Sequence, residues 1–407
     1  MTFKNRYPWT LVGLLWVVAL LNYLDRQMLA TMKPSMQIDI QELQSATNFG
    51  YLMAVFLWIY GLVSPFAGVV ADRVNRKWLI TISLFIWSGV TMAMGYAKTF
   101  DQLYWLRALM GVSEALYIPA GLALIAEHHT DKTRSLAVGI HMTGLYLGQA
   151  LGGFGATIAA RFSWNQTFFI FGLIGMIYSL VLIVFLKEDK RPAVSAPAGT
   201  KPSVFSGFRI LLSNLSFWVI LLYFTIPSLP GWAVKNWLPT LFSQNLNIDM
   251  SLAGPLSTIT TAGSSLIGVL LGGWLSDQWL QRSLRGRIYT SVIGLSLTIP
   301  ALILIGTGHT LFHVLGAAFC FGFGFGMFDA NNMPILCQFV SARHRSTAYG
   351  LMNMTGIISG ALITNWLGKS TDAGNLGRDF TLLAAVVVIA VILQVSILRP
   401  KTKDLKD

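Results

Sequence analysis

The chain contains a series of apolar segments that are each long enough to cross a lipid bilayer as a helix. Such a helix needs about 20 mostly apolar residues. Of the 407 residues, 54% are hydrophobic and only 11% are charged, whereas about a quarter of the residues in a typical soluble domain are charged. A soluble fold would leave much of this apolar surface in water, so we expect an all-α integral membrane protein.

Twelve transmembrane helices are predicted, in two groups of six. The first six are expected near 9–31, 47–70, 78–97, 103–127, 135–160 and 165–187, and the second six near 215–243, 251–275, 288–307, 311–340, 346–367 and 380–398. The polar stretch "KEDKRPAVSAPAGTKPS" separates the groups. We therefore predict an N-terminal six-helix bundle (1–187), a cytoplasmic linker (188–214) and a C-terminal six-helix bundle with a short cytoplasmic tail (215–407).

The distribution of basic residues predicts the orientation in the membrane. If the N-terminus is cytoplasmic, 21 of the 29 Lys and Arg residues fall on the cytoplasmic side and 5 on the outer side. Cytoplasmic loops of membrane proteins carry such an excess. The net charge of +12 therefore needs no nucleic-acid partner. We expect both termini in the cytoplasm of a multi-pass protein of the cell inner (plasma) membrane, where the lipid bilayer is its main partner and the chain is a monomer.

Short motifs recur about half a chain apart. "GVVADRVNRK" follows the second span and "GGWLSDQWLQRSLRGR" follows the eighth, and both place Asp four residues after Gly. "RSLAVG" is echoed by "RSTAYG", and Glu114-x4-Pro119 is echoed by Asp329-x4-Pro334. Transporters are commonly built from two such repeats with the binding site between them. The repeats predict two pseudo-symmetric bundles.

These motifs resemble those of the major facilitator superfamily over essentially the whole chain. "GVVADRVNRK" is similar to its loop signature, with Asn75 where Gly is usual. "LNYLDRQ" in the first span and "RALMGVSEA" in the fourth resemble the anion:cation symporter family, which includes proton-coupled carriers of sugar acids, and also the spinster-like carriers. "GLYLGQALGG" resembles the antiporter signature, but Gln149 replaces the expected Pro, which favours symport or facilitated diffusion over antiport.

The loop signature suggests a gate. Asp72 lies at a helix end, beside the basic residues Arg73, Arg76 and Lys77, and Asp277 takes the equivalent place in the second half. Opposite charges there can hold neighbouring helix ends together in one state and release them in the other. The alternative is that the basic residues only keep the loop inside.

Four ionisable residues lie inside spans of the first half: Asp25, Arg26, Arg107 and Glu114. Each costs roughly 2.5–3.5 kcal/mol on insertion scales, so each should face a partner or a cavity. Arg107 and Glu114 are seven residues apart, on nearly one helix face. We expect proton coupling through Asp25 and Glu114, with Arg107 beside Glu114; in the resembling family, acids at these places are implicated in that role. Arg26 should face the cavity or a neighbouring helix. A structural ion-pair ladder and an outward-pointing Arg26 are the alternatives.

The seventh span is expected to bind substrate. "PSLPGWAVKNWLPTL" contains three prolines, which suggest a broken helix of the kind that lines cavities. Lys235, flanked by Trp232, Asn236 and Trp237, offers a cation, an amide and flat rings, which suit a carboxylated sugar. The alternative is an interfacial lysine within an aromatic belt.

Further polar side chains in other spans could bind substrate hydroxyls. They are Tyr146 and Gln149 from the fifth span, Asn331 and Asn332 from the tenth, and Asn353 from the eleventh. For the tenth and eleventh spans, packing and hydrogen bonding between helices is the alternative.

The leading hypothesis is a secondary active transporter that works by alternating access and symports protons with an organic anion, such as a hexuronate or an aldonate. A spinster-like carrier of lysolipids or other amphipathic lipids is the second hypothesis. No cofactor is expected, with the proton as coupling ion. We find no metal-ligand cluster, no nucleophile with a base at workable spacing and no phosphate loop in the sequence, so we do not expect an enzyme.

Overall fold

The computed structural model describes residues 7–129, 133–187, 209–341, 344–400 and 402, and the regular secondary structure among them is all helical, with no strand. The N-terminal half comprises α1 (Tyr7–Asp39), η2 (Gln41–Gln44), α2 (Ala46–Arg73), α3 (Arg76–Met94), α4 (Phe100–Ala115), α5 (Tyr117–His128), α6 (Arg134–Gly152), α7 (Gly155–Phe162) and α8 (Trp164–Phe185). The C-terminal half comprises α10 (Leu215–Leu246), α11 (Met250–Arg282), α12 (Gly286–Thr307), α13 (Leu311–Asp329), α14 (Asn332–Phe339), α15 (Arg345–Asp372) and α16 (Leu376–Ile397).

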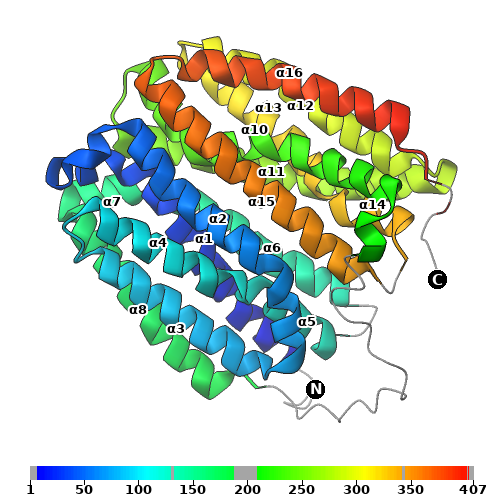
Figure 1. The fold of residues 1–407 in the computed structure, drawn as a ribbon, viewed down its shortest axis with the longest axis horizontal. Helices are drawn as coiled ribbons and strands as arrows, with labels where there is room; N and C mark the ends of the chain where they lie inside the picture. Colours follow the sequence, from blue (N-terminus) through cyan, green and yellow to red (C-terminus); the bar gives the residue numbers. More distant parts are fainter. Residues whose placement is uncertain (1–6, 130–132, 188–208, 342–343, 401, 403–407) are drawn as a thin grey trace.

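The two halves form separate bundles that lie side by side, the first in blue to green and the second in green to red (Figure 1). Helix pairs α4/α5, α6/α7 and α13/α14 each form one interrupted span, which gives twelve spans in the described chain. Helix α1 begins and α16 ends at the same end of the bundles, which we call the terminal end. The predicted linker falls largely outside the described residues, so the predicted domain boundaries stay a prediction.

Polar residues at the helix starts explain several of the boundaries. Ser45, Asn75, Thr99, Ser163 and Thr310 each accept a hydrogen bond from a backbone N–H in the first turn of the helix that follows. Such caps satisfy N–H groups that have no partner within the helix. Several helices are longer than the apolar segments that predicted them: α1 continues to Asp39 and α11 to Arg282.

Ten of the spans are long and apolar enough to cross a membrane by composition alone. The two that fall short are α6/α7 and α15, which hold equivalent places as the fifth span of each half. Both pack against the opposite half, α6 on α11 and α15 on α2. A helix that faces protein and a polar cavity needs less apolar surface than one that faces lipid.

Several hydrogen bonds join the halves at the end opposite the termini, which we call the distal end. The Asp372 carboxylate at the end of α15 accepts hydrogen bonds from the Ser45 hydroxyl (2.8 Å), the Ala46 N–H (2.7 Å) and the Thr47 N–H (2.8 Å) at the start of α2. Thr157 donates to the Ser251 carbonyl over 2.6 Å. Toward the terminal end, Asn353 donates to the Ser64 hydroxyl over 3.0 Å.

Candidate functional site

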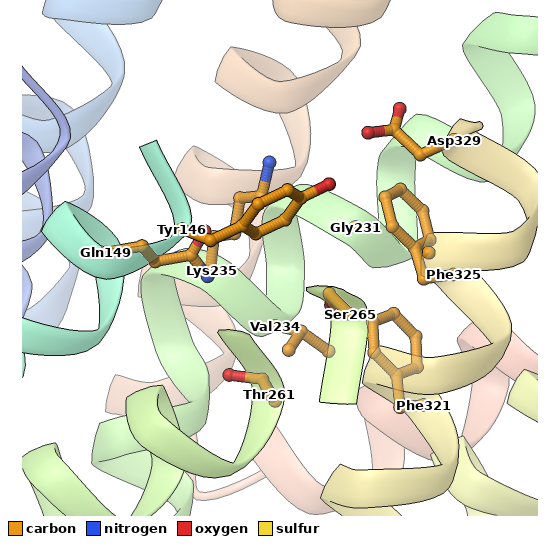
Figure 2. A pocket seen from close by; sticks show the side chains of 11 residues that line it. Tyr146, Gln149, Gly231, Val234, Lys235, Thr261, Ser265, Phe321, Phe325 and Asp329 are labelled. Atoms are coloured by element: carbon orange, nitrogen blue, oxygen red, sulfur yellow. The ribbon is translucent and has the colours of Figure 1, made fainter. Parts of the chain in front are cut away.

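A cavity of about 240 Å³ lies between the two halves. Its lining comes from α1, α2 and α6 of the first half and from α10, α13, α14 and α15 of the second. It combines polar groups with aromatic faces: Tyr23, Arg26, Tyr60, Ser228, Trp232, Lys235, Phe325, Phe328, Asp329, Asn332, Tyr349 and Asn353. A narrower void of about 30 Å³ is lined in part by Tyr146 and Gln149, and it shares Lys235 and Asp329 with the larger cavity (Figure 2).

Arg26 joins the cavity to a buried acid. Its Nε donates to Glu114 Oε2 over 2.6 Å, and the Glu114 side chain is 0% exposed. The guanidinium also lies over the rings of Tyr60 and Phe56, at 4.5 and 4.9 Å from the centroids. Cation–π contact and the ion pair together hold Arg26 at the wall of the cavity. Glu114 does not line the cavity itself, whereas its partner Arg26 does.

Arg107 lies behind this pair, away from the cavity lining. Its guanidinium is buried over the Phe56 ring at 4.6 Å, and its NH1 lies 3.1 Å from the Met110 sulfur. Arg107 Nε and Glu114 Oε1 are both buried with no hydrogen-bond partner in the described chain. Buried polar atoms without a partner are costly, so their position beside the Arg26–Glu114 pair needs an explanation.

Asp25 points away from Arg26, as expected for neighbours on a helix. It is buried between α1 and α3, where Thr91 Oγ1 lies 3.2 Å from Asp25 Oδ2 and 3.0 Å from the Trp87 carbonyl. A hydroxyl has one proton to donate, so it cannot donate to both oxygens at once. A protonated Asp25 would resolve this conflict by donating to Thr91.

Lys235 projects from α10 with its ammonium group 5.0 Å from the centroid of the Trp232 ring. Contrary to the prediction, the prolines do not break this span, and α10 is one continuous helix from Leu215 to Leu246. Pro239 has no N–H to donate to the Lys235 carbonyl four residues earlier. Gln27 of α1 donates to that carbonyl instead, over 2.9 Å. A residue of the first half thus satisfies the backbone at the lysine of the second.

Of the three interrupted spans, the fourth and the tenth break directly after their acids. Helix α4 ends one residue beyond Glu114 and α13 ends at Asp329. Pro119 and Pro334 stand five residues after the respective acid and cannot donate to the carbonyls of Ala115 and Ala330. The acid-x4-Pro repeat in the sequence therefore marks an interrupted helix in each half.

Asp329 lines both voids and was not among the site residues predicted from the sequence, although it was one of the few span acids. Asn332 donates to its Oδ1 over 3.0 Å, and the Tyr223 hydroxyl donates to Asn332 over 3.2 Å.

The glycine at position 360 lets the Trp232 indole lie against α15, because a Cβ there would overlap the ring. Trp232 was named beside Lys235 from the sequence, and it lines the cavity because it lies three residues before Lys235 on the same helix face.

Three predicted binding residues lie outside the cavity lining. Trp237 is 0% exposed, and its indole N–H donates to the Thr364 carbonyl over 3.1 Å. Asn236 donates to the Thr364 hydroxyl over 2.8 Å. Asn331 is also 0% exposed and donates to the Met327 carbonyl. These three residues pack helices together, whereas Arg26, Lys235, Tyr146, Gln149, Asn332 and Asn353 line the voids.

The predicted gating residues make contacts within their own halves. Arg76 forms an ion pair with Glu127 of α5, and Lys77 donates to the Ile183 carbonyl of α8 over 2.8 Å. Asp277 lies 3.9 Å from an Arg287 nitrogen. The side chains of Asp72 and Arg73 lie outside the described ones. Whether this group acts as a gate stays a prediction.

The sequence profile of the Major Facilitator Superfamily matches residues 15–364. The chain belongs to this superfamily. It is therefore a multi-pass membrane transporter for small molecules and not an enzyme.

The similar proteins include transporters of different kinds of substrate. A D-galactonate transporter of Escherichia coli O6:H1 is 26% identical over 67% of this chain and 67% of that protein. A sphingosine-1-phosphate transporter of Danio rerio is 24% identical over 88% of this chain and 74% of that protein. The crystal structure of a bacterial homolog of the human lysosomal transporter Spinster, inward-facing and unoccupied, matches with a TM-score of 0.79 at 20% identity, over 95% of this chain and 96% of that one.

Proposed function

We propose that this transporter is a proton-coupled symporter of a small organic anion, with a sugar acid such as a hexuronate or an aldonate as its preferred class. The observation that carries the proposal is the pair of cations, Arg26 and Lys235, that meet at one cavity from opposite halves. Cations bind carboxylates through strong charge-assisted hydrogen bonds. The surrounding amides, hydroxyls and ring faces suit a polyhydroxylated carbon chain, and the similarity to a D-galactonate transporter supports the same class.

Glu114 provides a way to couple a proton to this anion. While ionised, it holds Arg26 through the 2.6 Å hydrogen bond. A proton on Glu114 would remove the negative charge of the pair and leave the guanidinium available to a substrate carboxylate. Loss of the substrate would restore the pair and release the proton. In this scheme one carboxylate replaces another at Arg26, so the buried cation has a counter-charge in both the empty and the substrate-loaded state.

Asp25 is the second proton site of the proposal. Its only described side-chain partner is the Thr91 hydroxyl, which also lies within reach of the Trp87 carbonyl. A neutral Asp25 can donate to Thr91 while Thr91 donates to Trp87, so every proton has an acceptor. If Asp25 were ionised, its buried negative charge would have the Thr91 hydroxyl as its single described side-chain donor.

The orientation belongs to the same proposal: the terminal end faces the cytoplasm. Support comes from the excess of Lys and Arg in the segments at that end. The distal end, with its Asp372 hydrogen bonds, would then be the closed outer side.

A spinster-like lipid carrier is the second candidate, favoured by the similarity to the sphingosine-1-phosphate transporter. The size of the cavity argues for the sugar acid. Pockets for drug-sized ligands measure roughly 300–1,000 Å³, and this cavity measures about 240 Å³. Such a space suits a six-carbon acid better than a long-chain lipid.

Uptake by purified protein in liposomes tests the proposal. With an imposed gradient that makes the lumen alkaline, we expect labelled D-galactonate, gluconate or glucuronate to accumulate beyond equilibrium, and a protonophore to abolish the accumulation. Asp25→Asn should lose the gradient-driven accumulation while it retains exchange of internal for external substrate. The proposal is wrong if no carboxylated solute accumulates, and transfer of a lysolipid in the same liposomes would favour the second candidate.

A further inference from the structure

The second half holds a charged pair whose members do not touch. Lys235 and Asp329 occupy the same places in the first and fourth spans of their half as Arg26 and Glu114 do in theirs. Arg26 and Glu114 are joined in an ion pair, whereas no ion pair joins Lys235 to Asp329, both of which are described. Instead, Lys235 lies over Trp232, and Asp329 accepts from Asn332.

Both side chains reach the same enclosed space. Lys235 and Asp329 line the larger cavity and also the smaller void, and Asp329 is exposed where Glu114 is fully buried. Figure 2 shows the two charged groups separated, with the Tyr146 hydroxyl pointing to the side on which Asp329 lies. A bound solute can therefore meet a cation and an anion of the protein at different points.

We propose that Asp329 restricts the transporter to monocarboxylates that carry a hydroxyl group at a distance from the carboxylate. This inference rests on the proposed function. Arg26 and Lys235 bind the single carboxylate, and Asp329 accepts a hydrogen bond from a substrate hydroxyl, because an ionised carboxylate can only accept. A dicarboxylate of the same length places its second carboxylate against Asp329. Like charges brought together at a binding site cost enough to exclude the wrong partner.

A hydroxyl is the group that the surroundings of Asp329 favour. Asn332, Asn353 and Gln149 present amides to the two voids, and Tyr146 adds a phenolic hydroxyl. Amides and hydroxyls can both donate to and accept from a polyol chain. An ammonium group on the substrate would also satisfy the Asp329 charge, so an amino acid of similar length is one arm of the test.

The experiment compares competitors that differ at one end of a six-carbon chain. Uptake of labelled gluconate into liposomes is measured against unlabelled gluconate, glucarate, which has a second carboxylate, and 6-aminohexanoate, which has an ammonium group. For the wild type we expect glucarate to need at least about a tenfold higher concentration than gluconate for half-inhibition. In Asp329→Asn the two should differ by less than about threefold, because the repelling charge is gone.

Asp379→Asn is the matched control. Asp379 is an acid of the same half that is buried away from the cavity and accepts from the Trp366 indole over 2.9 Å. This variant should keep the wild-type preference for gluconate over glucarate. If Asp329→Asn does not fold, as judged by its elution as a single species in detergent, Asp329→Ser carries the same prediction.

Two results would overturn the inference and leave the proposed function intact: equal competition by glucarate and gluconate in the wild type, or an unchanged preference in the Asp329 variants. Stronger competition by 6-aminohexanoate than by gluconate would also overturn it, because Asp329 would then bind a cationic group. Absence of any gluconate-type uptake by the wild type would instead count against the proposed function itself.

Discussion

The two halves of the transporter place a cation in the first span and an acid at the break of the fourth, but they use them differently. In the N-terminal half Arg26 and Glu114 are in contact at 2.6 Å, and the acid is fully buried. In the C-terminal half Lys235 and Asp329 stand apart at the wall of the cavity. A joined pair has its charges neutralised internally and can respond to a proton, whereas separated charges remain available to a ligand. Duplicated helices can therefore divide coupling and recognition between them.

The largest expected effect is on the joined pair. Glu114→Gln leaves the Arg26 charge without its partner, which should lower the free energy of unfolding by about 3–5 kcal/mol. The double variant Arg26→Gln with Glu114→Gln should regain most of this loss, because no unpaired charge remains. Unfolding of the purified proteins in detergent measures both. A double variant as unstable as the sum of the two single ones would show that the pair does not act as a unit.

The next effect is on the separated pair and concerns substrate rather than stability. Lys235→Gln should raise the KM for a carboxylated substrate about tenfold or more, since a hydrogen bond to a charged group contributes roughly 1.5–3 kcal/mol. Trp237→Phe is the comparison, because Trp237 lies in the helix packing; it should leave KM unchanged. Initial rates of uptake over a range of concentrations give both values, and an equal rise in KM for the two variants would contradict the assignment.

A smaller effect is expected where the halves touch. Gln27→Leu removes the donor to the Lys235 carbonyl and leaves that carbonyl without a described partner. The loss should be about 0.5–1.5 kcal/mol of stability. Thermal unfolding of the variant measures it, with Gln27→Glu as a second variant that keeps the shape but cannot donate when ionised. No loss in either variant would mean that another group satisfies the carbonyl.

The last prediction has the smallest expected effect, but it tests the difference between the charged pairs of the two halves most directly. Lys235→Gln and Asp329→Asn should show a weak coupling energy in stability, because their two charges face each other across a shared cavity without forming an ion pair. The same double-mutant cycle on Arg26 and Glu114 should give a coupling several times larger. Similar couplings in the two halves would mean that Lys235 and Asp329 form a pair as well.

The sequence predicted the architecture well, because the lengths of the apolar segments indicate the spans and the repeated motifs indicate the two halves. It also singled out Arg26 and Lys235, since a cation within a span needs a cavity or a partner. It failed where the face of a helix decided the outcome. Trp232 lies three residues from Lys235 and shares its face, whereas Trp237 lies two residues away and points elsewhere. A helical projection would have separated them.

Other parts of the site lay beyond sequence reasoning for a structural reason. Asn331 falls in the break between α13 and α14, where helical periodicity no longer says which way a side chain points. The three prolines of α10 suggested a break, but the helix continues because a side chain from the other half supplies one of the missing donors. Contacts of this kind depend on the arrangement of two distant segments, which local patterns do not record.

The Asp372 carboxylate at the distal end has a consequence for the speed of transport. It caps α2 from across the boundary between the halves, through three hydrogen bonds. Any rocking motion that separates these helix ends must break all three and strip α2 of its anionic cap. These bonds would add to the barrier for such a motion at a place far from the cavity, so turnover number and affinity could be adjusted by different residues.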